Sequence, residues 1–308
     1  MIELTDVSFE YTTFKRQSGF KGSVQDLFSR KFEKIQALQP TDLTLASGAM
    51  VGLIGPNGAG KTTLIKLLTG ILVPKTGTVK IDGYLPSQKQ KPFLQQIGVL
   101  LGQKSQLSWD LPPQATFDML AAIYRLPKAQ YRARLAELSL RLDATELLDI
   151  PVRKLSLGQR VRCELIAVLL HQPKYLFLDE PTLGLDLVTQ RAIYEFLRTE
   201  NKRYHTTIIT TSHYVKDIEQ LADQLLILMD GKVIYNEPLT CFTCNIAQHQ
   251  FFTAELLTGG QVEKIRVEQE QLANFLAQVE LKNLVSLKRQ GLSLEDFIFE
   301  LFEKGDKR

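Results

Sequence analysis

The residues at 55–62 constrain the fold of this chain more than any other stretch. They read Gly-Pro-Asn-Gly-Ala-Gly-Lys-Thr and match the pattern G-x-x-x-x-G-K-[ST], in which backbone N–H groups surround the phosphates of a nucleotide. A short apolar run at 50–54 precedes this loop and is typical of a buried strand. An apolar segment at 63–68 follows it and is typical of a helix whose N-terminus faces the phosphates. A strand, a phosphate loop and a helix in this order predict a nucleotide-binding site.

Phosphate binding explains why particular residue types stand at particular positions of this loop. Gly58 and Gly60 allow a close approach of the backbone and φ values that a side chain would disfavour. Lys61 is expected to reach the β- and γ-phosphates, and the hydroxyl of Thr62 is expected to help hold Mg²⁺. The alternative is a glycine-rich turn that matches the pattern by chance, which the flanking strand and helix disfavour.

Composition restricts the class of protein. The 308 residues, of which 44% are hydrophobic and 23% charged, are typical of an ordinary soluble globular chain with one large and one smaller domain. A net charge of +3 is too small to indicate nucleic acid, so no nucleic-acid partner is expected. Three cysteines form no disulfide framework, and no secretory signal opens the chain, so we expect a reducing cytosol. No apolar run approaches the roughly 20 residues of a membrane span, so another chain would have to cross a membrane.

The pattern along the chain predicts an α/β architecture. Residues 2–9 alternate like a strand, with 42–45 as its expected partner. Strands are also expected at 78–81, after a turn at Thr76-Gly77, at 97–101, 175–178 and 207–211, with a hairpin formed by 225–229 and 232–235. Helical periodicity over about 104–172 predicts an inserted helical lobe. Strands separated by helices after a phosphate loop favour a mostly parallel sheet with helices on both faces.

A second chemical motif ends the run at 175–180. Four apolar residues are followed by Asp179 and Glu180. In a parallel sheet the carboxyl end of this strand lies beside the phosphate loop, so Asp179 is expected near Mg²⁺. Glu180 would then face the γ-phosphate, where it could polarise an attacking water. The alternative is an acidic turn that closes the strand before Pro181.

A third motif is Leu-Ser-Leu-Gly-Gln-Arg at 155–160, before an apolar helix expected over 161–170. It offers a second helix N-terminus suited to an anion. One protein rarely needs two such sites for one γ-phosphate. The simplest explanation is that this second site serves an ATP bound to another subunit.

The order and spacing of these motifs resemble the ATP-binding cassette (ABC) family, specifically the nucleotide-binding subunit of a transporter, over about residues 1–240. Residues 55–63 look like Walker A, 155–159 like the signature, 175–180 like Walker B and 184–186 like the D-loop. Gln103 is similar to the Q-loop glutamine and His213 to the switch histidine. Tyr11 is the best candidate for the aromatic ring that stacks on adenine, with Phe14 as the alternative.

The resemblance implies a P-loop NTPase core with a parallel sheet, an antiparallel β subdomain and the inserted helical subdomain at about 104–172. Residues 241–308 would form a small α+β extension of unknown role. The resemblance also implies a head-to-tail dimer with a second copy or a homologous ATPase subunit, holding two ATP molecules. The residues expected to bind ATP are Gly55, Pro56, Asn57, Gly58, Ala59, Gly60, Lys61, Thr62, Thr63, Tyr11, Ser156, Gly158, Gln159 and Asp186. Those expected to act in catalysis are Glu180, His213, Gln103 and Lys61, and those expected to hold Mg²⁺ are Thr62, Gln103 and Asp179.

A separate transmembrane permease is the other implied partner. Gln103 and the segment 104–113 would sense it, which places the chain at the cytoplasmic face of the cell membrane. The segment at 100–112, the basic insertion at 15–34 and the tail at 292–301 resemble a multidrug or polysaccharide exporter branch, so export is favoured over import. The basic insertion is either a solvated loop or a contact with anionic lipid headgroups or a membrane partner.

One position departs from the family pattern, which has glycine in place of Leu157. A side chain there adds bulk close to a γ-phosphate, although branches of the family that resemble this chain tolerate it. We therefore expect an active ATPase. One alternative is a regulatory subunit with weak catalysis. The other is a soluble cassette ATPase that acts on ribosomes or DNA, which a single phosphate loop and the lack of a sustained heptad run disfavour.

Overall fold

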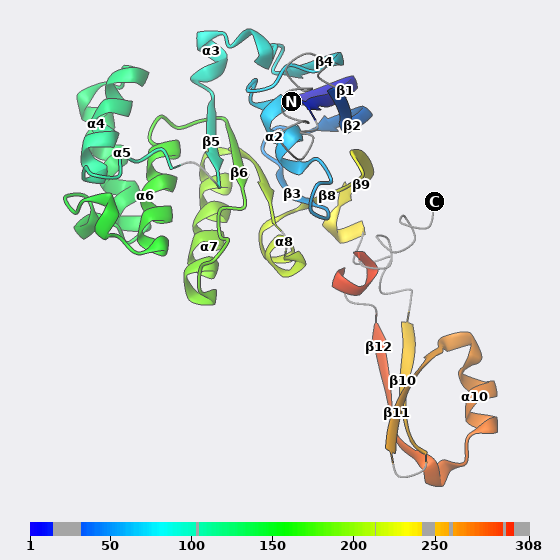
Figure 1. Ribbon diagram of the computed structural model, residues 1–308. Coiled ribbons are helices and arrows are strands. Elements are labelled where there is room, and N and C mark those ends of the chain that lie inside the picture. Colours follow the sequence, from blue (N-terminus) through cyan, green and yellow to red (C-terminus); the bar gives the residue numbers. More distant parts are fainter. Residues whose placement is uncertain are drawn as a thin grey trace, which may run out of the picture. The chain divides into compact units, whose positions relative to one another are not determined.

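Short apolar runs that the sequence marks as buried strands form one six-stranded sheet, in the order β5-β6-β7-β3-β8-β9 (Figure 1). This computed structural model describes residues 1–14, 32–102, 105–212, 214–241, 250–258, 261–291 and 294–298. Neighbours from β5 to β8 pair in parallel, which confirms the predicted parallel sheet. The strands of this sheet are β3 (Met50–Ile54), β5 (Ile97–Leu101), β6 (Tyr175–Asp179), β7 (Thr207–Thr211), β8 (Gln224–Met229) and β9 (Lys232–Pro238).

The two faces of this sheet are covered by different elements. Side chains alternate along a strand, and in β6 Leu176 and Leu178 join one hydrophobic cluster whereas Tyr175 and Phe177 join another. The first cluster includes residues of α6 and α7, and the second includes residues of α2 and of a second, antiparallel sheet. The expectation of helices on both faces is thus met by helices on one face and by a helix with a sheet on the other. The helices are α2 (Lys61–Leu68), α6 (Leu157–Leu169), α7 (Leu187–Tyr204) and α8 (Val215–Leu221).

The antiparallel sheet has the order β2-β1-β4, with β1 at Ile2–Phe14, β2 at Phe32–Leu45 and β4 at Thr76–Ile81. The predicted partners are confirmed, since Ile2 pairs with Leu45. Gly77, expected in a turn, instead lies inside β4 with φ +75°. A Cβ on Gly77 would lie 2.2 Å from the carbonyl oxygen of Asp6, at a register shift of β1, so only glycine fits there. The basic insertion at 15–34 falls outside the described residues apart from 32–34 in β2.

The helical lobe lies between β5 and β6 in the sequence, as predicted. In it, Phe117 of α4 and Leu135, Leu138 and Leu142 of the α5 region are buried, which agrees with the helical periodicity predicted over about 104–172. Pro113 stands at the first position of α4, where its missing N–H costs no hydrogen bond. The elements from β4 to the lobe are η1 (Pro86–Gln88), α3 (Lys91–Leu94), α4 (Pro113–Tyr124), α5 (Lys128–Arg141), η2 (Thr145–Leu147) and η3 (Val152–Lys154).

The chain divides into two compact units, Met1–Asn236 and Glu237–Arg308. The second is an α+β unit with an antiparallel sheet in the order β11-β10-β12. Its elements are β10 (Gln250–Thr258), β11 (Gln261–Glu268), η4 (Gln269–Gln271), α10 (Leu272–Gln278), η5 (Leu281–Asn283) and β12 (Leu284–Gly291). None of the helices in the described ranges has the length and hydrophobicity of a membrane span.

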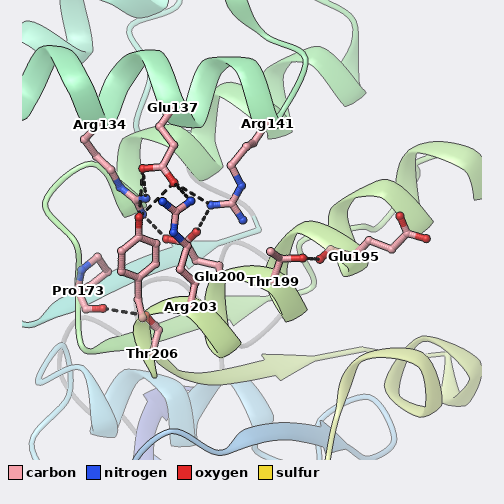
Figure 2. A network of polar contacts seen from close by, with 10 residues as sticks. Arg134, Glu137, Arg141, Pro173, Glu195, Thr199, Glu200, Arg203 and Thr206 are labelled. Carbon is pink, nitrogen blue, oxygen red and sulfur yellow. Dashed lines mark hydrogen bonds and ion pairs between the residues drawn. The ribbon is translucent and has the colours of Figure 1, made fainter.

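A buried ion-pair network joins the helical lobe to the core (Figure 2). Glu200 of α7 is 1% exposed and pairs with Arg134 of α5, which is 3% exposed. The second carboxylate oxygen of Glu200 accepts a hydrogen bond of 2.6 Å from Arg141. Around this pair, Glu137 accepts from Arg134 at 3.0 Å and from Arg203 at 2.7 Å. Because the carboxylate of Glu200 is desolvated, its arginine partners on α5 set where the lobe sits on α7.

We predict that Glu200→Gln lowers the free energy of unfolding by about 3 kcal/mol, because two guanidinium groups lose their buried counter-charge. Glu195→Gln is the matched control, since Glu195 is an exposed residue of the same helix. Urea denaturation monitored by circular dichroism measures the free energy of unfolding of both variants. A Glu200→Gln protein as stable as the control would show that the network does not hold the lobe.

A half-buried histidine, His171, makes a second contact between the helical lobe and the core. His171 follows α6, and its Nε2 lies 2.9 Å from the carbonyl oxygen of Ile97, to which it donates in the neutral form. Its ring stacks on Tyr124 of α4 with centroids 3.9 Å apart. Burial lowers the pKa of His171 from 6.5 to about 4. The folded protein therefore keeps His171 neutral where the unfolded chain binds a proton.

This pKa gives a pH dependence with a defined sign. Between about pH 6.5 and about pH 4 the unfolded state binds more protons, so stability falls as the pH falls. We expect His171→Gln to remove about 2 kcal/mol of the stability difference between about pH 7 and about pH 5. His205→Gln, at an exposed position after α7, should keep the wild-type pH dependence. Identical pH profiles for wild type and His171→Gln would refute this assignment.

Candidate nucleotide-binding site

The phosphate loop runs from the end of β3 to Lys61, where α2 begins two residues earlier than expected. Gly58 and Gly60 have φ values of +82° and +103°, in the region that favours glycine. A Cβ on Gly60 would lie 2.3 Å from the carbonyl oxygen of Ala37 in β2. A Cβ on Gly55 would lie 2.1 Å from the carbonyl oxygen of Leu228 in β8. The glycines therefore let the loop pass between two strands.

Lys61 points back into this loop. Its side chain is buried, and Nζ donates to the carbonyl oxygens of Gly55 at 2.7 Å and Pro56 at 3.1 Å. Burial lowers the pKa of the Lys61 ammonium, and the negative charges of Glu180 and Asp179 act in the opposite direction. The cation and both carboxylates thus belong to one electrostatic environment.

Asp179 is held by hydroxyl groups on both sides. Its Oδ2 accepts a hydrogen bond of 2.9 Å from Thr62, the second residue of α2. Its Oδ1 accepts one of 2.7 Å from Thr211, the last residue of β7. The parallel register pairs Asp179 with Thr211, which brings the strand end to the loop as the sequence predicted for Asp179. Sequence reasoning missed the part of Thr211, which the matching ends of two predicted strands could have indicated.

Glu180 has an unusual backbone conformation. Its φ is +53°, which a non-glycine residue adopts only where its surroundings impose it. Its N–H donates to Thr211 Oγ1 at 2.9 Å, so the hydroxyl that holds Asp179 also holds the Glu180 backbone. With residues such as Ser212 and Asp217, Glu180 lines a small pocket.

The signature residues form the first turn of α6, which corrects the predicted helix at 161–170. The helix begins at Leu157 and ends at Leu169. Ser156 Oγ accepts from the N–H of Gln159 at 3.3 Å, and Gln159 Oε1 accepts from the N–H of Ser156 at 2.9 Å. This capping box satisfies two backbone donors and starts the helix four residues earlier than periodicity indicated.

Asp186 caps α7 in a similar way. Its carboxylate accepts from the N–H groups of Val188 at 3.0 Å and Thr189 at 2.9 Å, and from the Thr189 hydroxyl at 2.7 Å. The hydrogen bond from the Thr189 hydroxyl, followed by those from the backbone, lowers the pKa of the Asp186 carboxyl. Asp186 therefore ends the loop that begins at Glu180 and starts the helix that carries Glu200.

Tyr11 of β1 lies beside the phosphate-loop helix, with its hydroxyl 3.3 Å from Thr63 Oγ1. Its ring meets Phe9 edge-on, with centroids 4.9 Å apart. Gln103 and His213 lie outside the described residues. The strands that precede them in the sequence, β5 and β7, both pair with β6 at Asp179, through Leu101 and Thr211.

Comparisons with known proteins agree with this geometry. A sequence profile described as "ABC transporter" matches residues 38–183. The chain is 30% identical over 212 residues to the ABC transporter ATP-binding protein NatA of Bacillus subtilis, covering 69% of this chain and 86% of that protein. The chain belongs to the ABC transporter family. As a member it is an ATP-binding and ATP-hydrolysing subunit.

Two further relatives are named after different substrates. The daunorubicin resistance ATP-binding protein DrrA3 of Streptomyces coeruleorubidus is 34% identical over 67% of this chain and 64% of its own length. The sulfate/thiosulfate import ATP-binding protein CysA of Thermosynechococcus vestitus is 32% identical over 70% of this chain and 66% of its own length. Membership of the family therefore leaves the direction of transport open.

Solved structures support the fold. The structure described as an ATP-binding subunit of an ABC transporter has a TM-score of 0.66 at 24% identity, over 80% of this chain and 93% of that one. A dimeric post-hydrolysis structure of the cassette MJ0796, bound to ADP and Pi, has a TM-score of 0.64 at 24% identity. The match covers 78% of this chain and 99% of that one. Both confirm the predicted P-loop NTPase architecture.

The double role of Thr211 yields a testable prediction. Thr211→Val should lower kcat for ATP hydrolysis roughly tenfold to a hundredfold, because it removes the hydroxyl that accepts from the Glu180 N–H and donates to Asp179 Oδ1. Thr211→Ser keeps the hydroxyl and should restore most of the rate. Thr210→Val is the matched control, since Thr210 is equally buried on the same strand but faces the other way. A rate for Thr211→Val within about twofold of wild type would contradict this role.

Proposed function

We propose that this subunit hydrolyses ATP through Glu180 and thereby powers export through a separate transmembrane permease. The observation that carries the proposal is the group formed by Lys61, Thr62, Asp179 and Glu180 at the ends of β3 and β6. It combines a buried cation in a glycine loop with two carboxylates that differ in their environment. Asp179 is held by two hydroxyls, and Glu180 stands one residue further along.

In this proposal the residues of the loop, Gly55 to Thr63, bind the phosphates of ATP, and Tyr11 stacks on its adenine. Thr62 Oγ1 and Asp179 Oδ2, 2.9 Å apart, are the hard oxygen ligands that suit Mg²⁺, with Gln103 as a third. The ion neutralises charge on the β- and γ-phosphates when bound. Glu180 accepts a proton from the attacking water, and His213 assists at the γ-phosphate.

The second half of the site would come from a partner subunit. Ser156, Gly158 and Gln159 bind the ATP of a second copy or a homologous ATPase. Asp186 lies at the interface between the two subunits and also contacts the nucleotide. The support is the position of these residues at the first turn of α6, where the backbone N–H groups that the capping box does not use are available to an anion. Ser156 is exposed in the single subunit, as a contact with a partner requires.

Attachment to the membrane would be indirect. The segment at 104–113 and Gln103 contact the permease, so the subunit sits at the cytoplasmic face of the cell membrane. Trp109 and Leu111 in this segment are 54% and 50% exposed, which suits a contact with another chain. We infer that residues 1–240 form the ATPase domain and that residues 241–308 form an extension of unknown role.

The experiment that tests this function is Glu180→Gln. The variant should lose steady-state hydrolysis and keep ATP binding, because the amide cannot accept the proton but leaves the phosphate loop intact. Glu146→Gln, an exposed change in η2, should hydrolyse ATP like wild type. Full turnover by Glu180→Gln would remove Glu180 from catalysis. A variant that stays monomeric with ATP and the permease present would refute the shared site.

A further inference from the structure

The side chain of Leu157 has a partner within its own subunit. Leu157 is the first residue of α6, and its side chain is 42% exposed. Its Cδ2 lies 3.2 Å from the position that a Cβ on Gly184 would take. Gly184 has φ +78°, a conformation that favours glycine. Leu157 thus lies over the bare backbone of Gly184, in the loop between Glu180 and α7.

The next residue of α6 borders the same region. A Cβ on Gly158 would lie 3.3 Å from Thr189 Cγ2 and 4.0 Å from Leu185 Cδ2. Thr189 is in turn bound to Asp186 through its hydroxyl. Two successive residues of the signature therefore border the loop and the first turn of α7, and only Leu157 contributes a side chain to this contact.

The loop beyond Gly184 leads directly back to Glu180. The N–H of Leu183 donates to the carbonyl oxygen of Glu180 at 3.3 Å, and the N–H of Leu185 donates to that of Thr182 at 3.2 Å. These two hydrogen-bonded turns are short and consecutive. A displacement of Gly184 is therefore transmitted to the backbone of Glu180 over very few bonds.

We propose that Leu157 is a positioning residue that ties the Ser156 segment to the loop after Glu180, so that the two shift together within one subunit. This inference rests on the proposed function, in which Ser156 faces the nucleotide of the partner and Glu180 acts on the subunit's own. Leu157 links a contact with one nucleotide to the geometry at the other through packed side chains. Glycine at this position would leave Gly184 uncovered and the two segments free to move separately.

The test compares Leu157→Ala with Leu157→Met in the full chain without nucleotide. Amide hydrogen exchange in the loop at 182–187 should be about tenfold faster in Leu157→Ala, because Gly184 loses its cover, and near wild type in Leu157→Met. Leu140→Ala, a leucine 76% exposed on α5, controls for the loss of an exposed apolar side chain and should leave the loop unchanged. Unchanged exchange in Leu157→Ala overturns the proposal.

ATPase kinetics supply the second measurement. In Leu157→Ala kcat should fall about threefold or more with KM within about twofold of wild type, and Leu157→Met should restore kcat. Faster loop exchange with an unchanged kcat would overturn the link to Glu180. A wild-type protein without ATP turnover would instead refute the proposed function, while the exchange measurement would still decide whether Leu157 holds the loop.

Discussion

The hydroxyl of Thr211 is the interaction on which the site depends. It donates to Asp179 and accepts from the N–H of Glu180, so one buried group orients both acidic residues. The other oxygen of Asp179 binds Thr62 and connects this pair to the phosphate-loop helix. Because these groups are largely removed from water, a missing partner costs more than a normal hydrogen bond contributes. The geometry of the phosphate loop, of Asp179 and of Glu180 is therefore set jointly.

The parallel sheet makes this arrangement possible. It brings the carboxyl ends of β3, β6 and β7 to one edge, where β3 leads into the phosphate loop, β6 ends in Asp179 and β7 ends in Thr211. The strands can end together because apolar side chains fill both faces, with α6 and α7 on one and α2 with the antiparallel sheet on the other. The layers support the site through their apolar faces, and the first turn of α2 also supplies Thr62 to it.

Helix α7 connects the site to the helical lobe. It is capped by Asp186, at the end of the loop after Glu180, and carries the buried Glu200 near its other end. The arginines of α5 hold Glu200, and Leu157 of α6 covers Gly184. The lobe thus meets the core at both ends of one rigid helix. A shift of the lobe would therefore displace the loop after Glu180, because packed contacts rather than a flexible link connect the two.

Much of the fold and of the candidate site could be predicted from local sequence patterns. The phosphate loop, the strand that ends in Asp179 and Glu180, and the periodicity of α4 and α5 are properties of short segments, so the sequence was sufficient. Other features are non-local. Periodicity placed the start of α6 too late because the capping box, although present in the sequence, lies outside the apolar stripe. Gly77 looked like a turn because its close contact is with Asp6 of β1, which is far from it in the chain.

The sequence by itself determined that the chain binds a nucleotide, since a glycine loop with its lysine and threonine has one main physical use. It also determined the two carboxylates at a strand end and the signature at a helix start. Only the tertiary structure decided that Thr211 joins the carboxylates, that Glu200 lies buried between two helices, and that Leu157 rests on Gly184. The reason is that these contacts depend on strand register and helix packing, which bring together residues whose order in the chain says nothing of their distance.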